Sequence, residues 1–131
     1  MNQADDAELH RAIAAHRAGK LPAAELHYRA FLGRHPEHAG ANHNLGLLMA
    51  QRGDPQKALP NLRRALESDA SQGQYWLSYA KALAAAGHGR DALALLQSGK
   101  QRGLSGAAFE ALVARLKDAN SSGDDAPDPA V

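Results

Sequence analysis

Histidine is the residue type in this chain best suited to metal or acid–base chemistry, and the sequence contains seven of them. His35 and His38 flank Pro36 and Glu37 in a segment whose composition indicates a turn. A turn could bring two imidazoles together, but no cysteine or third strong ligand lies nearby in the sequence. We therefore expect no metal site and interpret both side chains as solvated loop histidines.

Motifs for catalysis are missing from the sequence. It has no G-x-S-x-G nucleophile elbow, no serine with an evident base, no P-loop and no G-x-G-x-x-G after a strand. The carboxylates are scattered and have no paired context that would shift their pKa values. We expect a chain that is not an enzyme and needs no cofactor.

Bulk properties narrow the class of protein further. The chain has 131 residues, no cysteine and a formal net charge of +1. This length suits one domain, and the weak, dispersed charge argues against a nucleic-acid partner. The N-terminus lacks the apolar region of a signal peptide, and no apolar run approaches the roughly 18 residues of a membrane span. We expect a soluble, cytoplasmic protein with no membrane partner.

The segment from Asn42 to Leu66 has the pattern of two short helices. Gly53 occupies the position of a helix C′ residue, Asp54 that of the next N-cap and Pro55 that of N1. Each helix has one apolar face, and a lone hairpin cannot bury both faces.

Small residues recur at a spacing of 34 positions, which indicates stacked copies of this hairpin. Three columns show the period: Gly19, Gly53 and Gly87; Ala24, Ala58 and Ala92; Ala12, Gly46 and Ala80. The glycines suit a left-handed cap conformation, and the other two columns allow two helices to cross closely. Each hairpin would therefore be covered by the next copy.

These residues resemble the tetratricopeptide repeat family. The middle copy matches the family pattern at Leu45, Gly46, Gly53, Ala58 and Ala65, and departs from it at Asn42, Met49 and Leu62. The resemblance implies an all-α, right-handed solenoid. We predict a repeat domain over residues 5–118, with hairpins at about 5–38, 39–72 and 73–104.

A capping helix should occupy residues 105–118, with Ser105 as its N-cap. Its apolar stripe is formed by Phe109, Leu112, Val113 and Leu116. This gives seven helices, followed by a polar tail at 119–131 that we expect to be disordered or a linker. Pro60 lies inside a predicted helix, where we expect a local bend, and Gly99 replaces the usual alanine.

In the tetratricopeptide family the first helix of each hairpin lines a concave groove that binds extended or helical peptides. The resemblance therefore implies a partner-binding groove built from Leu9, His10, Ile13, His16, Arg17, His43, Asn44, Leu47, Gln51, Gln74, Leu77, Ser78 and Lys81. Of the groove positions that hold a terminal carboxylate in chaperone-binding members, only Asn44 matches, so we reject that clamp. The asparagine ladder of O-GlcNAc transferase repeats is matched only at Asn44 as well.

The sequence also holds a small basic cluster in its second hairpin, which we interpret as a solvated outer face. It consists of Arg52, Lys57, Arg63 and Arg64.

The leading interpretation is a protein-interaction module that binds a peptide or protein partner in its groove. Because the sequence is also similar to the N-terminal repeat segments of bacterial glycosyltransferases, the alternative is a substrate-recruiting domain of such an enzyme. A third possibility is a module that self-associates through its repeat ends.

Overall fold

The computed structural model describes residues 2–122, which form seven α-helices and no strands. The helices are α1 (Gln3–Arg17), α2 (Leu21–Arg34), α3 (Ala39–Gln51), α4 (Pro55–Ser68), α5 (Gly73–Ala85), α6 (Gly89–Gln101) and α7 (Ala107–Ser122). The chain is therefore an all-α helical-repeat solenoid, as the 34-residue period predicted.

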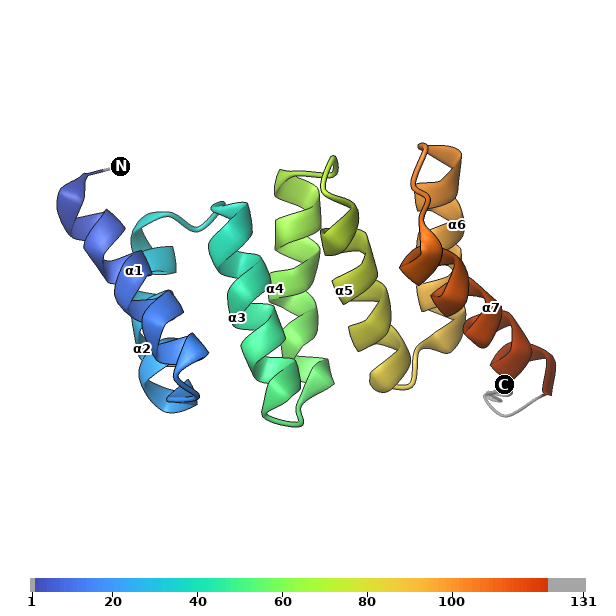
Figure 1. The fold of residues 1–131 in the computed structure, drawn as a ribbon, viewed down its shortest axis with the longest axis horizontal. Coiled ribbons are helices and arrows are strands. Elements are labelled where there is room, and N and C mark those ends of the chain that lie inside the picture. Colours follow the sequence, from blue (N-terminus) through green and yellow to red (C-terminus); the bar gives the residue numbers. More distant parts are fainter. Residues whose placement is uncertain (1, 123–131) are drawn as a thin grey trace.

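Three helical hairpins stand side by side in a row, and α7 packs on the last of them (Figure 1). The hairpins are α1–α2, α3–α4 and α5–α6. Contacts between α3 and α5 and between α5 and α7, together with a hydrogen bond from His16 on α1 to Gln51 on α3, bring the odd-numbered helices next to one another. We call the surface formed by α1, α3, α5 and α7 the odd-helix face.

The turn inside each hairpin is made possible by a glycine. Gly19, Gly53 and Gly87 have φ values of +77°, +83° and +93°, a region that residues with a Cβ rarely adopt. In the middle hairpin the next helix starts at once, because the side chain of Asp54 accepts a hydrogen bond from the Lys57 amide and Pro55 occupies the first turn. The predicted helix boundaries are confirmed here.

Close helix crossing depends on the column of small residues. A Cβ on Gly46 would lie 2.5 Å from the side chain of Leu62 on α4, so only glycine fits at this crossing. Ala12 and Ala80, at the equivalent positions, are fully buried. The interpretation that small residues let the paired helices approach is confirmed.

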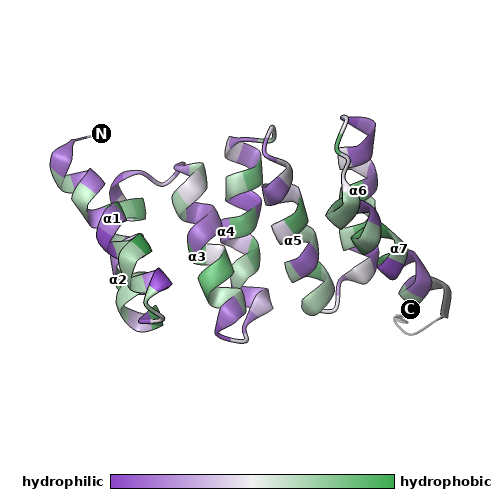
Figure 2. Cartoon of the chain, viewed as in Figure 1, coloured by the Kyte–Doolittle hydropathy of each residue, from purple (hydrophilic) through white to green (hydrophobic). Residues whose placement is uncertain are grey.

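The core consists of two clusters of buried side chains. One lies mainly in the first two hairpins, where it includes Tyr28, Leu45 and Leu62, and it extends to Ala82 on α5. The other joins the third hairpin to α7, where Phe109 and Leu112 pack with buried neighbours such as Leu96. Hydrophobic and hydrophilic residues alternate along each helix, which is the pattern expected when one stripe faces the core (Figure 2). The apolar stripe of α7 thus covers the end of the third hairpin.

Asn42 on α3 stands where the tetratricopeptide pattern has a tryptophan, and its polar side chain is accommodated by hydrogen bonds. Asn42 is completely buried, and its amide nitrogen donates to the carbonyl oxygens of Pro36 and His38 at 2.9 and 3.0 Å. Its amide oxygen accepts from Asn61 on α4 at 2.9 Å. The amide therefore fastens α3 to α4 and to the preceding loop in place of an aromatic ring.

The boundaries of α7 differ from the sequence prediction. The helix begins at Ala107, so Gly106 precedes its first residue and Ser105 lies outside the N-cap position. The helix also continues to Ser122, beyond the predicted end at residue 118. The rest of the predicted tail, residues 123–131, lies outside the described residues. Pro60 is exposed within α4, which runs unbroken from Pro55 to Ser68.

Candidate functional site

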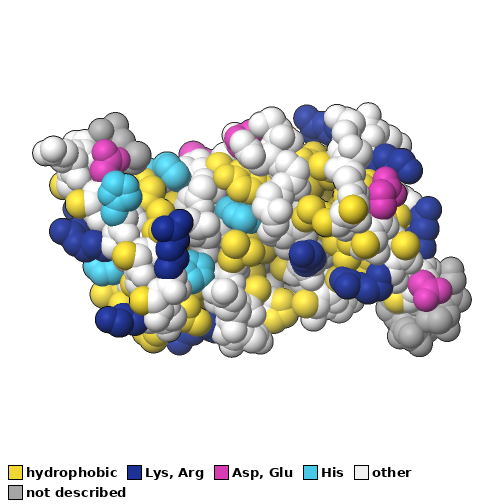
Figure 3. Space-filling view, viewed as in Figure 1, with side chains coloured by type: hydrophobic (Ala, Val, Ile, Leu, Met, Phe, Trp, Pro, Cys, Tyr) yellow, Lys and Arg dark blue, Asp and Glu magenta, His cyan; other side chains and the backbone are white. Residues whose placement is uncertain are grey.

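The residues predicted for the groove all lie on α1, α3 and α5, but they differ in exposure. His10, Arg17, Gln51, Gln74 and Lys81 are exposed; Leu9, Ile13, His16, Asn44, Leu47 and Leu77 are half-buried; His43 and Ser78 are buried. Figure 3 shows hydrophobic side chains gathered over the middle of this surface, with histidine, lysine and arginine side chains around them. The odd-helix face therefore offers apolar contact area together with hydrogen-bonding groups.

A buried polar pair joins α3 to α5. The Nε2 atom of His43 lies 2.8 Å from the hydroxyl oxygen of Ser78, and these residues are only 8% and 5% exposed. The amide of Gln74 also donates to the Ser78 hydroxyl at 3.3 Å, and the Tyr75 ring lies 4.7 Å from the His43 ring. Burial lowers the pKa of His43, which favours the neutral imidazole in this contact.

This pair corrects the expectation that no serine has a neighbouring base. The two residues are 35 positions apart, so the base became evident only when the hairpins stacked. The pair still lacks the third member of a catalytic triad, because no carboxylate hydrogen-bonds to His43 among the described residues. Its geometry is that of a structural contact between two helices.

A pocket of about 410 Å³ opens between α1 and α3. Its lining residues are Ile13, His16, Arg17, Tyr28, Asn44 and Gln51. The ring of His16 spans this site, since Nε2 donates to the Gln51 side-chain oxygen at 2.6 Å and Nδ1 accepts from the Tyr28 hydroxyl at 3.1 Å. Burial raises the pKa of Tyr28, against the opposing effects of a hydrogen bond with Asn44 and the charge of Arg17.

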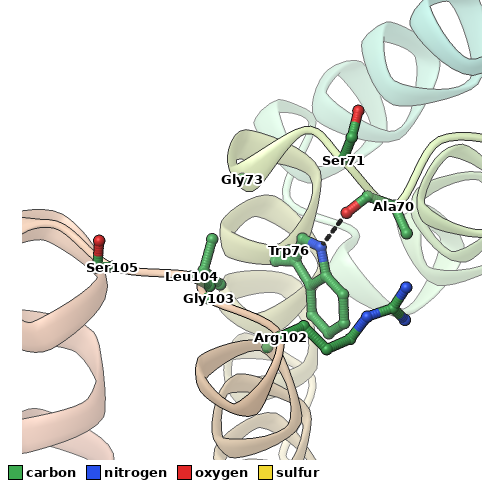
Figure 4. A pocket seen from close by; sticks show the side chains of 9 residues that line it. Ala70, Ser71, Gly73, Trp76, Arg102, Gly103, Leu104 and Ser105 are labelled. Atoms are coloured by element: carbon green, nitrogen blue, oxygen red, sulfur yellow. Dashed lines mark hydrogen bonds between the residues drawn. The ribbon is translucent and has the colours of Figure 1, made fainter.

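A second pocket, of about 470 Å³, lies where the loop before α5 meets the loop after α6 (Figure 4). The Trp76 indole nitrogen donates to the carbonyl of Ala70 at 2.9 Å, and the guanidinium of Arg102 lies 5.6 Å from the ring centre. A Cβ on Gly99 would lie 3.0 Å from this ring, which explains why glycine replaces alanine here. This pocket was not predicted from the sequence, because its lining residues come from two loops and helix ends that meet only in the folded chain.

The two loop histidines have structural contacts and are not merely solvated, which corrects the sequence interpretation. His35 lies 2.8 Å from one carboxylate oxygen of Asp5, and Arg34 donates to the other at 3.0 Å. These contacts lower the pKa of Asp5, the hydrogen bond with His35 having the largest effect. His38 caps α3 by accepting a hydrogen bond from the Ala41 amide. Residues 2–122 contain no group of three or more potential ligands that could hold a metal ion.

The basic cluster of the second hairpin is mostly paired with acidic side chains. Arg52 contacts Glu25 at 2.8 Å, and Lys57 and Arg63 lie 3.7 and 4.0 Å from Asp54 and Glu67. All are surface pairs of small energetic consequence. Across the described residues, we find no helix that combines the length and hydrophobicity needed to span a membrane.

The chain consists of stacked helical hairpins that repeat every 34 residues. Each hairpin has a glycine at its turn and a small residue where its helices cross, and these features define a class of helical-repeat proteins. The family model described as tetratricopeptide repeat matches residues 49–116, just over half of the chain. The chain therefore belongs to the tetratricopeptide repeat family.

Solved structures show the same fold. The tetratricopeptide domain of Sgt2 from Aspergillus fumigatus has a TM-score of 0.81 and 15% identity, over 98% of this chain and 86% of that one. The TPR2B domain of yeast Sti1, solved as a complex with pHsp70, has a TM-score of 0.68 and 18% identity, over 95% and 91%. A Thermobaculum terrenum O-GlcNAc transferase has a TM-score of 0.66 and 28% identity, over 77% of this chain and 20% of that enzyme. No curated protein matches the sequence.

Proposed function

We propose that this chain is a non-catalytic protein-interaction module whose odd-helix face binds a peptide or an extended segment of a protein partner. The observation that carries this proposal is the composition of that face. Leu47 and Leu77 present half-buried apolar surface on adjacent helices, and the exposed Gln51 and Lys81 supply polar groups beside them. An extended peptide needs both kinds of contact, because its backbone amides require partners when they leave water.

Hydrogen bonds between the odd-numbered helices support a preformed surface. His16 on α1 bonds to Gln51 on α3, and His43 on α3 bonds to Ser78 on α5. These contacts link α1 to α3 and α3 to α5 within the chain itself. A surface that is already ordered loses little conformational entropy on binding, which favours affinity.

Peptide display on the full chain tests this proposal. We expect a random 12-residue library to yield binding peptides, and we expect Leu47→Glu to weaken their binding at least tenfold, because it places a charge in the apolar part of the face. Arg64→Glu is the matched control, since Arg64 is an exposed residue of α4. Thermal unfolding of each variant shows whether it is folded. Equal binding by the native chain and a folded Leu47→Glu variant would refute the proposal.

The alternative, a recruiting domain of a glycosyltransferase, has one observation in its favour. The O-GlcNAc transferase match is 28% identical, and it aligns 77% of this chain with a fifth of that enzyme. An antibody raised against residues 2–122 tests it on a blot of the source cells. A native product much heavier than 13.8 kDa would favour the enzyme-domain alternative, and a product of that mass would exclude it.

A further inference from the structure

We propose that the pocket between α1 and α3 binds an acidic side chain of the partner peptide, with Arg17 as its principal recognition residue. This inference rests on the proposed function and specifies the chemistry of the partner. The pocket is lined by one arginine and one histidine, and neither aspartate nor glutamate is among its lining residues.

Arg17 is available to an incoming carboxylate. Its side chain is exposed at the pocket, and none of the ion pairs among the described residues involves it. Its charge acts within the pocket, where it opposes the rise in the pKa of Tyr28. A guanidinium offers paired N–H donors in a geometry that fits a carboxylate.

The carboxylates near Arg17 in the sequence are bound elsewhere, and the nearest of them, Glu25 on α2, is paired with Arg29 and Arg52. On α1, Asp5 is held by Arg34 and His35, and Glu8 is held by His27. Asp6 is exposed, but it lies eleven residues from Arg17 in the sequence, or about 16 Å along a helix. No carboxylate of α1 therefore neutralises Arg17.

Further cations occupy the same face, so its charge complements an acidic segment. Lys81 on α5 and Arg115 on α7 fall in one column of the 34-residue period, and both are exposed without an ion pair among residues 2–122. The acidic side chains visible in Figure 3 lie toward the edges of the surface. Favourable long-range attraction would bring an acidic peptide to this face and set its orientation.

Polar groups around Arg17 would complete the site. The amide of Asn44 reaches the same pocket from α3, and Ile13 supplies an apolar wall for the methylene groups of an incoming side chain. The volume of about 410 Å³ lies near the small end of ligand pockets, so it suits one side chain and not a folded segment.

A comparison of acidic peptides with their amide analogues tests this inference. The probes are fluorescein-labelled peptides from the display selection, each made with its Asp and Glu residues and again with Asn and Gln in their place. Dissociation constants are measured by fluorescence anisotropy for the native full chain, Arg17→Gln and the control Arg64→Gln. We expect acidic peptides to bind the native chain about fivefold more tightly than their analogues. Arg17→Gln should abolish this preference, and Arg64→Gln should retain it.

The outcomes separate this inference from the proposed function. Peptides whose binding Leu47→Glu weakens, but which show no preference for acidic side chains, would overturn the inference and leave the proposed function standing. Equal weakening of both peptides of a pair by Arg17→Gln would also overturn it, because the effect would not concern the carboxylate. If no selected peptide binds to the odd-helix face, both proposals are overturned. Salt provides an independent check, since 300 mM NaCl should reduce the preference that 50 mM NaCl allows.

Discussion

Individual residues of the odd-helix face divide into those that hold helices together and those that are free to meet a partner. His43 and Ser78 belong to the first group, because their side chains are buried and bonded to each other. Leu47 and Lys81 belong to the second group, whereas the exposed Gln51 has both roles, because its side-chain oxygen already accepts a hydrogen bond from His16. The sequence placed all five on one face, but it could not separate them, because the contact between His43 and Ser78 joins different repeats.

The His43 contact predicts a dependence of stability on pH. Burial lowers the pKa of His43 in the folded chain, so the unfolded chain binds the proton more readily. The stabilising contribution is therefore complete above the unfolded pKa of about 6.5 and decreases as the pH falls below it. We expect His43→Gln, which cannot be protonated, to reduce the loss of melting temperature between pH 7.5 and 5.5.

The matched control is His10→Gln, because His10 is exposed on α1. It should leave the pH dependence of the melting temperature nearly unchanged. If the melting temperature of His43→Gln falls between pH 7.5 and 5.5 as much as that of the native chain, the buried imidazole does not titrate in this range.

Two glycines in helices should respond oppositely to substitution by alanine. Gly46→Ala should lower the free energy of unfolding by about 1–3 kcal/mol, because the new Cβ would lie 2.5 Å from Leu62. Gly33→Ala should raise it by up to about 1 kcal/mol, since no atom lies within 4 Å of the new Cβ and alanine favours a helix. Urea denaturation measures both. The reverse order of stability would contradict the packing described for α3 and α4.

Among the helices, the boundaries that depend on a few neighbouring residues were predicted best from the sequence. Gly53, Asp54 and Pro55 end one helix and begin the next through their own backbone preferences and side chains, so the sequence placed that boundary correctly. Ser105 was a weaker signal, because several consecutive residues could have started α7. The structure begins that helix at Ala107, two residues later.

The capping role of α7 predicts a large cost for removing its main apolar anchor. Phe109 is almost fully buried in the cluster that joins α7 to the third hairpin. Phe109→Ala should destabilise the chain by about 3–5 kcal/mol, through lost burial and the cavity that remains. The control Lys117→Ala, at an exposed position of the same helix, should change stability by about 0.5 kcal/mol or less. A small effect of Phe109→Ala would mean that α7 is not needed to seal the solenoid.

Over the whole molecule, repetition made the fold predictable, because each hairpin buries its surface against the next copy. The pockets were not predictable in the same way. The pocket beside Arg17 combines α1, α2 and α3, and its walls are set by contacts such as that between His16 and Gln51. A period in the sequence shows which positions are equivalent, but it does not show which side chains pair across repeats.

The end of the solenoid formed by α2 bears on the alternative of self-association. Leu26 is 69% exposed and is the one exposed large hydrophobic side chain identified on the described surface. If this end mediates association, light scattering at high concentration should show a mass above 13.8 kDa that Leu26→Glu returns to the monomer value. A monomer at all concentrations would exclude this alternative.

Partner binding to the odd-helix face is tested most directly by mapping the contact by NMR. A display-selected peptide is titrated into the ¹⁵N-labelled full chain, and the backbone amides whose chemical shifts change are assigned. We expect the largest changes along α1, α3 and α5, around Arg17, Leu47 and Lys81. Changes concentrated on α2, α4 and α6, or confined to the two ends of the solenoid, would contradict it.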